Sequence, residues 1–368
     1  MKTHQVQQKT ERRISAALRL VFVAALLLGQ IALAFFLSTE LRQRAAIIYT
    51  VLELAAFGYA VRIYNRTDGT SYKFGWIFLV LTVPVVGLIL YFLWNGDRQQ
   101  KRLDLKKLPM PEEPEAQQAA HRIQMEKLRR KYPQWERLSV YLGRQGYLLY
   151  GDTEAKYLPT GEMFLQDMLE KLEQAEHFIF LEFFIIAQGQ IWDRMEEIFR
   201  RKAAAGVEVK IIFDDFGSMM RFPAGQIEAL RESGVEVQVF NPVHHYVNRL
   251  YFNYRDHRKI VCIDGSTAYT GGANVADEYA NLTVRFGYWK DCGIRLDGAG
   301  AWGLTREFLH MWQRNGGQLM QERDYYRPHD HREAAGFCQP FVDGPDNNPI
   351  STAEDVFLHL INNARRSV

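Results

Sequence analysis

The sequence predicts an α/β fold with a mixed sheet, preceded by transmembrane helices at the N-terminus. Beyond residue 138, amphipathic helical stretches alternate with short apolar runs, which is typical of helices layered on a sheet. Before residue 95, three long apolar stretches follow one another closely. We therefore divide the 368 residues into transmembrane helices at 1–97, a juxtamembrane linker and helix at 98–137, an α/β domain at 138–340 and a last segment at 341–368.

The three apolar stretches span residues 14–37, 45–63 and 74–94. Each is long enough, at about 20 residues, to cross a bilayer as a helix. Buried core helices are the alternative, and three such stretches in succession argue against them. The first stretch lacks the small-residue cleavage site of a signal peptide, and further spans follow it. We therefore expect a multi-pass protein of the cell membrane.

Basic residues precede the first expected span, separate the second from the third, and are densest at 98–107. Three spans put the two ends on opposite sides, so the positive-inside rule cannot place both basic ends in the cytoplasm. The dense cluster after the third span favours a cytoplasmic α/β domain, with these side chains on anionic headgroups.

The α/β domain begins with helices and strands that alternate along the chain. Helices are expected at residues 161–176, 192–205, 223–233 and 302–312, and strands at 177–186, 207–214, 235–240, 260–263, 268–270 and 291–296. Active sites of such sheets lie beyond the carboxyl ends of the strands. That places Glu182, Asp214 and Asp215 near one rim, although a turn after a strand is the simpler interpretation of the two aspartates.

The most informative residues are His257, Lys259 and Asp264, spaced as H-x-K-x4-D and followed by Gly-Gly-x-Asn with Gly272 and Asn274. Residues two apart in a strand share a face, so His257 and Lys259 are expected side by side. An imidazole can act as nucleophile or general acid near neutral pH, and an ammonium can hold phosphate oxygens. A lone His beside a Lys is usually only surface, but the full pattern indicates attack on a phosphate ester.

On this motif the chain resembles the phospholipase D superfamily, and within it the bacterial cardiolipin synthases. The resemblance runs from the N-terminal apolar segments to the last residue, and includes residues 178–186, 206–218, 288–291 and 341–346. It implies that 138–340 is the first phospholipase D-like catalytic half, an α/β sandwich half, and that 341–368 begins an incomplete second half.

The resemblance implies phosphatidyl transfer through a phospho-histidine. In that chemistry His257 is the nucleophile, while Lys259 and Asn274 hold the phosphate oxygens. Gly272 lets the backbone approach closely. The expected substrates are two phosphatidylglycerols, which give cardiolipin and glycerol; another transphosphatidylase or a phospholipase D-type hydrolase is the alternative.

Three carboxylates complete the expected site. Asp291 matches the family's carboxylate that orients the nucleophilic imidazole. Asp264 is expected to position the motif's own backbone and side chains rather than to act as an acid or base, and Glu182 is a supporting carboxylate. No metal or cofactor is expected, because the Lys and Asn groups supply the electrostatics that a metal would otherwise provide.

Only one copy of the motif is present, although this superfamily uses two. An internal repeat with an offset of 189 residues matches one helix with the last expected helix, 352–368: Leu169, Leu172 and Ala175 correspond to Leu358, Ile361 and Ala364. The second motif is therefore expected from a missing C-terminal half or from a paired chain. Without either, the chain would be an inactive membrane-anchored fragment.

Bulk properties narrow the partners. A net charge of +2 argues against nucleic acid as a partner. The three cysteines, Cys262, Cys292 and Cys338, indicate neither a disulfide framework nor a zinc site. Phosphatidylglycerol and anionic membrane lipid are the expected partners.

Overall fold

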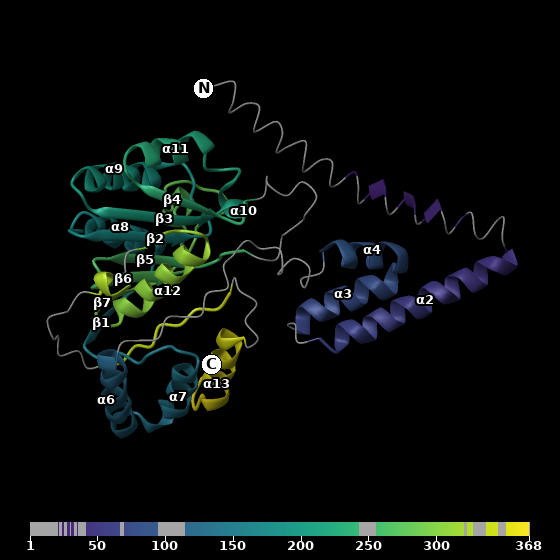
Figure 1. Ribbon diagram of the computed structural model, residues 1–368, viewed down its shortest axis with the longest axis horizontal. Helices are drawn as coiled ribbons and strands as arrows, with labels where there is room; N and C mark the ends of the chain where they lie inside the picture. Colours follow the sequence, from purple (N-terminus) through teal and green to yellow (C-terminus); the bar gives the residue numbers. More distant parts are fainter. Residues whose placement is uncertain are drawn as a thin grey trace. The chain divides into compact units, whose positions relative to one another are not determined.

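The computed structural model describes residues 42–66, 70–94, 115–242, 255–319, 322–326, 336–344 and 351–367, with scattered helical positions between 21 and 35 (Figure 1). The chain separates into two compact units. One contains Met1–Leu103, and the other contains Asp104–Pro242, Tyr254–Asn348 and Thr352–Val368. Each unit is described by itself.

A seven-stranded mixed sheet, in the order β1-β7-β6-β5-β2-β3-β4, forms the centre of the second unit. Its strands are β1 (Thr153–Leu158), β2 (Phe178–Phe183), β3 (Glu208–Asp214), β4 (Glu236–Phe240), β5 (Lys259–Ile263), β6 (Thr267–Gly271) and β7 (Gly293–Gly298). Strands β2, β3 and β4 are parallel, whereas β5, β6, β7 and β1 are joined by antiparallel pairing. The predicted α/β class with a mixed sheet is confirmed.

Helices cover both faces of the sheet. Helices α8 (Gly161–Leu172), α9 (Gln190–Ala204) and α11 (Ala224–Glu232) supply the expected amphipathic faces, and buried residues of α8, α9 and α11 share one core with the odd-numbered residues of β2. Helix α12 (Ala301–Arg314) packs on the other face, against the even-numbered residues of β2. Because a strand's side chains alternate between faces, a strand covered on both sides reads as a continuous apolar run, as β2 does.

The register of the central strands decides where the motif lies. In the antiparallel β2–β5 pair, Phe183 is opposite Lys259 and Ile179 is opposite Ile263. The start of β5 therefore lies at the sheet edge where the parallel strands β2 and β3 end. His257 and Lys259 are at this edge, as predicted, and Asp264 is at the opposite edge.

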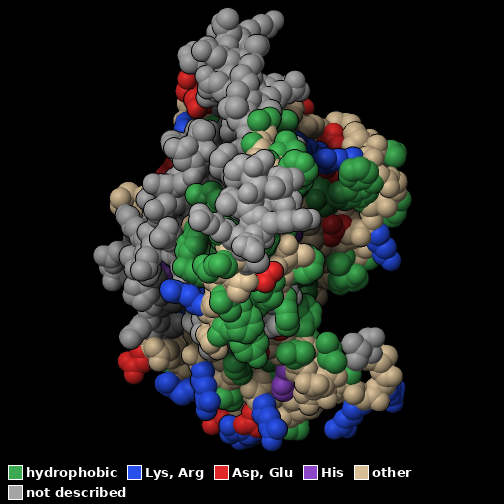
Figure 2. Space-filling model, turned by 90° about the vertical axis from the view of Figure 1, so that its right-hand side faces the viewer, with side chains coloured by type: hydrophobic (Ala, Val, Ile, Leu, Met, Phe, Trp, Pro, Cys, Tyr) green, Lys and Arg blue, Asp and Glu red, His purple; other side chains and the backbone are tan. Residues whose placement is uncertain are grey.

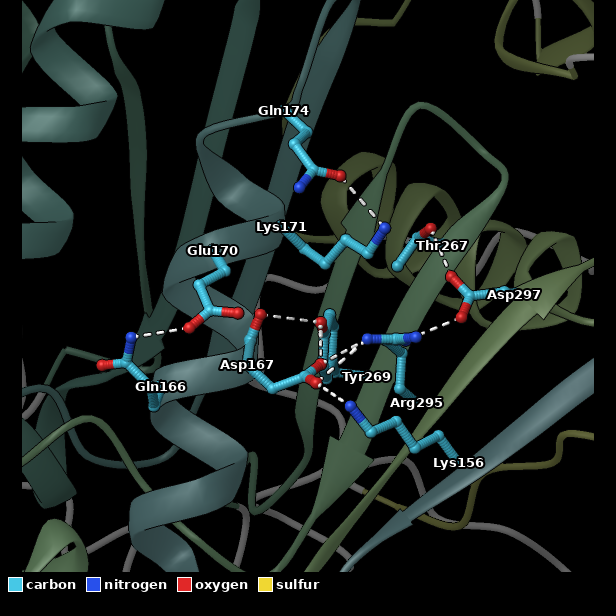
Figure 3. Close-up of polar contacts among 10 residues, drawn as sticks. All are labelled: Lys156, Gln166, Asp167, Glu170, Lys171, Gln174, Thr267, Tyr269, Arg295 and Asp297. Atoms are coloured by element: carbon cyan, nitrogen blue, oxygen red, sulfur yellow. Dashed lines mark hydrogen bonds and ion pairs between the residues drawn. The ribbon is translucent and has the colours of Figure 1, made fainter.

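A charged brace ties α8 to the antiparallel side of the sheet (Figure 3). The Asp167 carboxylate accepts hydrogen bonds from Tyr269 Oη at 2.6 Å and from Arg295 Nη1 at 2.8 Å, and it pairs with Lys156 Nζ at 2.5 Å. Arg295 also pairs with Asp297 at 2.6 Å. These contacts join one helix to β1, β6 and β7. The edge strand β1 is therefore held by an ion pair as well as by its backbone hydrogen bonds to β7.

Three further helices of the second unit lie outside the two layers on the sheet. Helix α6 (Glu115–Lys131) appears where the juxtamembrane helix was predicted, and α7 (Glu136–Arg144) follows it. The predicted C-terminal helix is α13 (Thr352–Asn363), which packs on α7. Tyr141 Oη donates to the Asp355 carboxylate at 2.5 Å across this contact.

The first unit contains α2 (Arg42–Tyr64), α3 (Thr70–Thr82) and α4 (Pro84–Trp94). Residues Ile47–Tyr64 of α2 are long and apolar enough to cross a membrane, and among the described helices no other meets both criteria. Exposed hydrophobic side chains of this unit, such as Phe57 and Phe78, face solvent in the isolated chain. Figure 2 shows hydrophobic side chains, in green, gathered on the face that it draws.

The single helix expected at 74–94 is divided into two helices in the structure. The helix ends at Thr82 and a second helix starts at Pro84, because proline lacks the backbone N–H and its ring blocks the preceding turn. A Cβ added at Gly87 would lie 2.5 Å from the Leu79 carbonyl oxygen, so α4 packs tightly against α3. At 13 and 11 residues, neither helix reaches the length of about 20 residues that a span needs.

The expected first span, residues 14–37, lies mostly outside the described residues. Among the described residues one helix is long and apolar enough to cross a membrane, and the three spans that the sequence suggested stay a prediction.

Candidate active site

His257 and Lys259 form a close pair at the edge of the sheet. Lys259 is buried as the first residue of β5, while His257 is exposed just before it. Lys259 Nζ lies 3.0 Å from His257 Nδ1 and donates to the His257 carbonyl oxygen at 2.7 Å. Phe184, the residue after β2, packs on both side chains. Its ring centroid lies 4.7 Å from the imidazole centroid and 5.7 Å from Lys259 Nζ. The predicted side-by-side placement of these two residues is present.

The electrostatics of this pair suit a neutral nucleophile beside a cation. Partial burial and the Lys259 ammonium lower the pKa of His257. Burial also lowers the pKa of Lys259 to about 8, although the negative charges of Asp256 and Asp291 act to raise it. Near pH 7 the imidazole is therefore largely neutral while the ammonium keeps most of its charge. The arrangement places an ammonium that can bind a phosphate oxygen beside a neutral imidazole.

Asp264 does not take part in this cluster. It occupies the left-handed region with a φ of 51°, at the far end of β5. Its two carboxylate oxygens accept hydrogen bonds of 2.8 Å from the backbone N–H groups of Glu176, His177 and Phe178. The inclusion of Asp264 among the catalytic residues is therefore corrected. It fixes the entry of β2 against the exit of β5, and so sets the register that carries His257.

Asp291 lies at the motif edge without a hydrogen bond to His257 among the described contacts. Its carboxylate accepts from the Cys292 N–H at 2.9 Å, and it stabilises the charged form of Lys259. A Cβ at Gly272 would lie 2.2 Å from Asp291 Oδ1. The glycine thus permits close approach, as expected, but the group that approaches in this structure is the Asp291 carboxylate.

The Asn274 side chain makes its hydrogen bonds to other residues of the protein and is not exposed at the site. The side chain is 2% exposed. Its Oδ1 accepts from the Ile185 N–H at 3.0 Å, and its Nδ2 donates to Tyr279 Oη at 2.8 Å. In this structure the residue that was expected to bind phosphate holds the loop after β2 against the segment that follows the two glycines.

Glu182 is fully buried below the motif edge. Burial, with the nearby charge of Asp256, raises its pKa well above the usual value. Its nearest described cation is Arg258, whose Nη1 lies 3.6 Å from Glu182 Oε1. Arg258 Nη2 donates to the Gly344 carbonyl oxygen. Glu182 therefore supports Arg258, which connects the motif to the segment at 336–344, and it does not reach the His257–Lys259 pair.

Asp214 is the residue whose role the sequence did not reveal. It ends β3 and accepts hydrogen bonds of 2.8 Å from the N–H groups of Phe216 and Asp256, and one of 3.2 Å from Arg255 Nη1. Burial raises its pKa to about 6. It holds the chain immediately before His257. The available signal was its position at the carboxyl end of a parallel strand, which was interpreted as a turn.

A cavity of about 720 Å³ opens beside the motif. His257, Lys259 and Gly272 contribute to one part of its wall. The rest of the lining is mostly apolar and comes from β5, β7, α12, the segment at 336–344 and α13; it includes Ile260, Ile294, Leu296, Leu304, Phe341, Val342 and Phe357. Polar reactive groups beside an apolar cavity suit an amphiphilic substrate.

Among the described residues, no group of three or more His, Cys, Asp or Glu side chains is arranged to hold a metal ion. The cation that contacts His257 is the Lys259 ammonium, at 3.0 Å between Nζ and Nδ1.

Two parts of the chain match known protein families. Residues 168–284 match the family described as "Cardiolipin synthase, PLD-like domain", and residues 54–95 match "Phospholipase_D-nuclease N-terminal". An uncharacterized protein of Streptococcus mutans is 34% identical, over 84% of this chain and 67% of that protein. Cardiolipin synthase 2 of Bacillus anthracis is 30% identical, over 86% of this chain and 61% of that enzyme. The chain thus spans about three fifths to two thirds of the length of these relatives.

Solved structures with a related arrangement are more distant. NucT from Helicobacter pylori is 12% identical with a TM-score of 0.35, and covers 44% of this chain and 97% of its own. Phosphatidylserine synthase from Haemophilus influenzae is 13% identical with a TM-score of 0.36, and covers 51% and 45%. Likenesses at this level say nothing of what this chain does. The H-x-K-x4-D motif, the paired His257 and Lys259, the two family matches and the sequence relatives together carry the conclusion that the chain belongs to the phospholipase D superfamily, among its cardiolipin synthase-like members.

Proposed function

We propose that this protein takes part in phosphatidyl transfer, converting two phosphatidylglycerols into cardiolipin and glycerol. The observation that supports this most is the His257–Lys259 pair, a largely neutral imidazole 3.0 Å from an ammonium at an open sheet edge. His257 attacks the phosphorus of one phosphatidylglycerol, and the bond to the terminal glycerol oxygen breaks. A hydroxyl of the second phosphatidylglycerol then attacks the phospho-histidine, which releases cardiolipin and restores the imidazole.

The imidazole must change partner for this attack. While Nδ1 faces the Lys259 ammonium, Nδ1 is the acceptor and the proton of the neutral ring is on Nε2. A bound phosphate draws the ammonium away, because a charge-assisted contact with an anion is stronger than one with a neutral nitrogen. We assign Asp291, whose charge already acts on Lys259, as the carboxylate that then accepts Nδ1–H and frees Nε2 to attack.

The departing glycerol oxygen needs a proton donor, which we assign to the histidine of a second motif. That motif comes from a C-terminal half or from a paired chain. The exposed apolar face of α13 supports a partner surface here: Leu358 and Ile361 are each 49% exposed, whereas their counterparts in α8, Leu169 and Leu172, are 3% and 0% exposed. Membrane attachment through α2, with the catalytic unit on the cytoplasmic side, completes the proposal.

Product analysis tests the reaction itself. The full chain, with any second-motif partner supplied, is reconstituted in phosphatidylglycerol vesicles, and His257→Ala is the matched control. Cardiolipin and glycerol are expected in equal amounts from the wild type and neither from the variant. Phosphatidate without cardiolipin would instead show a phospholipase D-type hydrolase, in which water takes the phosphatidyl group.

A second candidate is a membrane-anchored chain that is inactive alone, which the single motif favours. Mixing His257→Ala chains with wild-type chains distinguishes the two. If two chains pair their motifs, activity falls more steeply than the wild-type fraction. If activity is absent from every mixture, including wild type alone, this chain by itself has no catalytic role.

A further inference from the structure

Residues 282–288 form a loop that exposes an unusual amount of apolar surface. All seven residues are exposed, and Val284, Phe286 and Tyr288 are 87%, 80% and 67% exposed, with Leu282 at 48%. Large apolar side chains gathered on one short segment mark an interaction site more often than scattered ones do. We call this segment the 282–288 loop.

The neck of the 282–288 loop is fixed. Asn281, in the left-handed region with a φ of 52°, accepts from the Trp289 N–H and donates to the Trp289 carbonyl oxygen, both at 2.8 Å. The Trp289 ring packs edge-on against Tyr279 at 4.7 Å between centroids, and Phe286 stacks on it at 6.3 Å. Because its two ends are tied to each other and to the core, the loop holds its apolar side chains out on a rigid base.

The 282–288 loop also adjoins the catalytic edge. Asp291, two residues beyond the neck, lies against Gly272 and acts on the charge of Lys259. The distance along the chain from the loop to the site is therefore only a few residues. A surface that the loop contacts lies next to the edge from which His257 is exposed.

Basic residues flank the apolar ones. Arg285 and Lys290 are exposed, and Arg285 Nη1 is held 3.0 Å from Glu278 Oε1. Glu278 in turn binds Arg221, which follows the exposed Met220 (60% exposed). Aromatic and aliphatic side chains mixed with cations are the composition of segments that enter the headgroup region of anionic bilayers.

We propose that the 282–288 loop docks on the surface of an anionic phospholipid bilayer and aligns the His257 edge with the headgroup phosphates. The proposal rests on the proposed function for its lipid substrate, and the apolar helix Ile47–Tyr64 of the same chain provides an independent reason to expect a bilayer nearby. A second protein surface, from another copy or from a second catalytic half, is the competing occupant that the experiment separates.

The test places an environment-sensitive fluorophore on the loop in the full chain. Val284→Cys is labelled with a nitrobenzoxadiazole dye in a Cys292→Ser background, since Cys292 is exposed whereas Cys262 is buried and Cys338 half-buried. The control is Glu232→Cys, at the exposed end of α11 and at the sheet edge opposite the motif. Both proteins are reconstituted in vesicles of equal phosphatidylglycerol and phosphatidylcholine, with and without brominated phosphatidylcholine.

Docking predicts a blue-shifted emission at position 284 that brominated lipid quenches, and neither effect at position 232. Water-like emission at position 284 overturns the proposal. So does a blue shift without lipid quenching, because that shows the loop buried against protein. The readout does not need turnover: quenching without conversion of phosphatidylglycerol would refute the proposed function alone, and conversion without quenching would refute the docking alone.

A second pair of variants checks the consequence for substrate delivery. The double variant Val284→Asp/Phe286→Asp is expected to lower conversion of bilayer phosphatidylglycerol by about tenfold or more, because charged residues cannot enter the headgroup region as apolar ones do. Conversion of short-chain phosphatidylglycerol dispersed as monomers should be unchanged. Val284→Leu/Phe286→Leu should behave as the wild type; equal losses with both substrates would show damage to the site and contradict docking.

Discussion

At the scale of single residues, the site depends on one ammonium that performs two tasks. After partial burial, the Lys259 charge is the second cause that lowers the pKa of His257, and under the proposed function the same ammonium binds the incoming phosphate. Both tasks follow from its burial at the start of β5, where water screens its charge poorly. The pair is therefore sensitive to the charge of residue 259 more than to its size.

Lys259→Met tests this dependence. Removing the ammonium should lower kcat/KM by about 100- to 1000-fold, the usual cost of losing a group that stabilises transition-state charge. The same change should raise the pKa of His257, because Lys259 is one of the charges that lower it. The acid limb of the pH–rate profile for the remaining activity should therefore move to higher pH. An unmoved limb would show that Lys259 does not act on the imidazole.

A second residue-scale prediction concerns Asp264. Asp264→Ala removes the acceptors of three backbone N–H groups and should lower the free energy of unfolding by about 2–3 kcal/mol. Asp264→Asn keeps one acceptor oxygen and tolerates the left-handed backbone, so its loss should be smaller. Denaturant titration in detergent measures both. Turnover per folded molecule of Asp264→Asn should remain near that of the wild type. A variant that folds but is inactive would show that Asp264 has a catalytic role after all.

At the scale of elements, the long segment between β6 and β7 brings the Asp291 carboxylate against Gly272, next to the motif. Gly272→Ala should displace Asp291, because the new Cβ would lie 2.2 Å from its Oδ1. We expect activity to fall by about tenfold or more while the melting temperature changes little, since residue 272 is exposed. Gly336→Ala is the matched control, because a Cβ there meets nothing within 4 Å. If the two changes had equal effects on activity, the position of Asp291 would not matter for catalysis.

The elements that the sequence predicted are those whose buried side chains produce a regular run of apolar residues in the sequence. Strand β2 is buried at every position, and its run of apolar residues shows this. Strand β1 was missed because residues Glu154 to Tyr157 are exposed and mixed in type, so their pairing with β7 comes from backbone hydrogen bonds and the Asp167 brace. At 74–94 the apolar composition correctly predicted helix, but it did not show that Pro84 would divide the segment into two helices.

The site was predictable only as far as it is local in sequence. His257 and Lys259 are two residues apart, and strand geometry alone brings them together. The places of Asp214 and Asn274 depend on neighbours 42 and 89 residues away, Asp256 and Ile185, which no local pattern reports. Long-range register therefore decides which polar residues lie at the open site and which hold neighbouring segments together.

At the scale of the whole molecule, α13 leaves an apolar face of the second unit uncovered. Phe357, Leu358 and Ile361 are 64%, 49% and 49% exposed, while Val356 and Thr352 are buried against the rest of the unit. Under the proposed function, a second motif reaches the site from a surface that this face can receive. The helix then belongs to an interface rather than to the surface of a finished domain.

Ile361→Asp probes that interface. Conversion of phosphatidylglycerol should fall at least tenfold, since a charge buried at an apolar contact costs several kcal/mol. The melting temperature of the chain alone should stay within a degree or two, because position 361 is already exposed in it. Glu354→Gln on the same helix serves as the control. Full activity of Ile361→Asp would exclude this face from the active assembly.

The contact between Arg258 and Gly344 has a mechanical consequence. Arg258 lies between His257 and Lys259, and its guanidinium donates to the backbone of the segment at 336–344, which precedes α13 in the chain. Under the proposed function, we therefore expect a surface that moves this segment to act on the peptide next to His257. Binding of a second catalytic surface would then alter the position of the imidazole through one side chain.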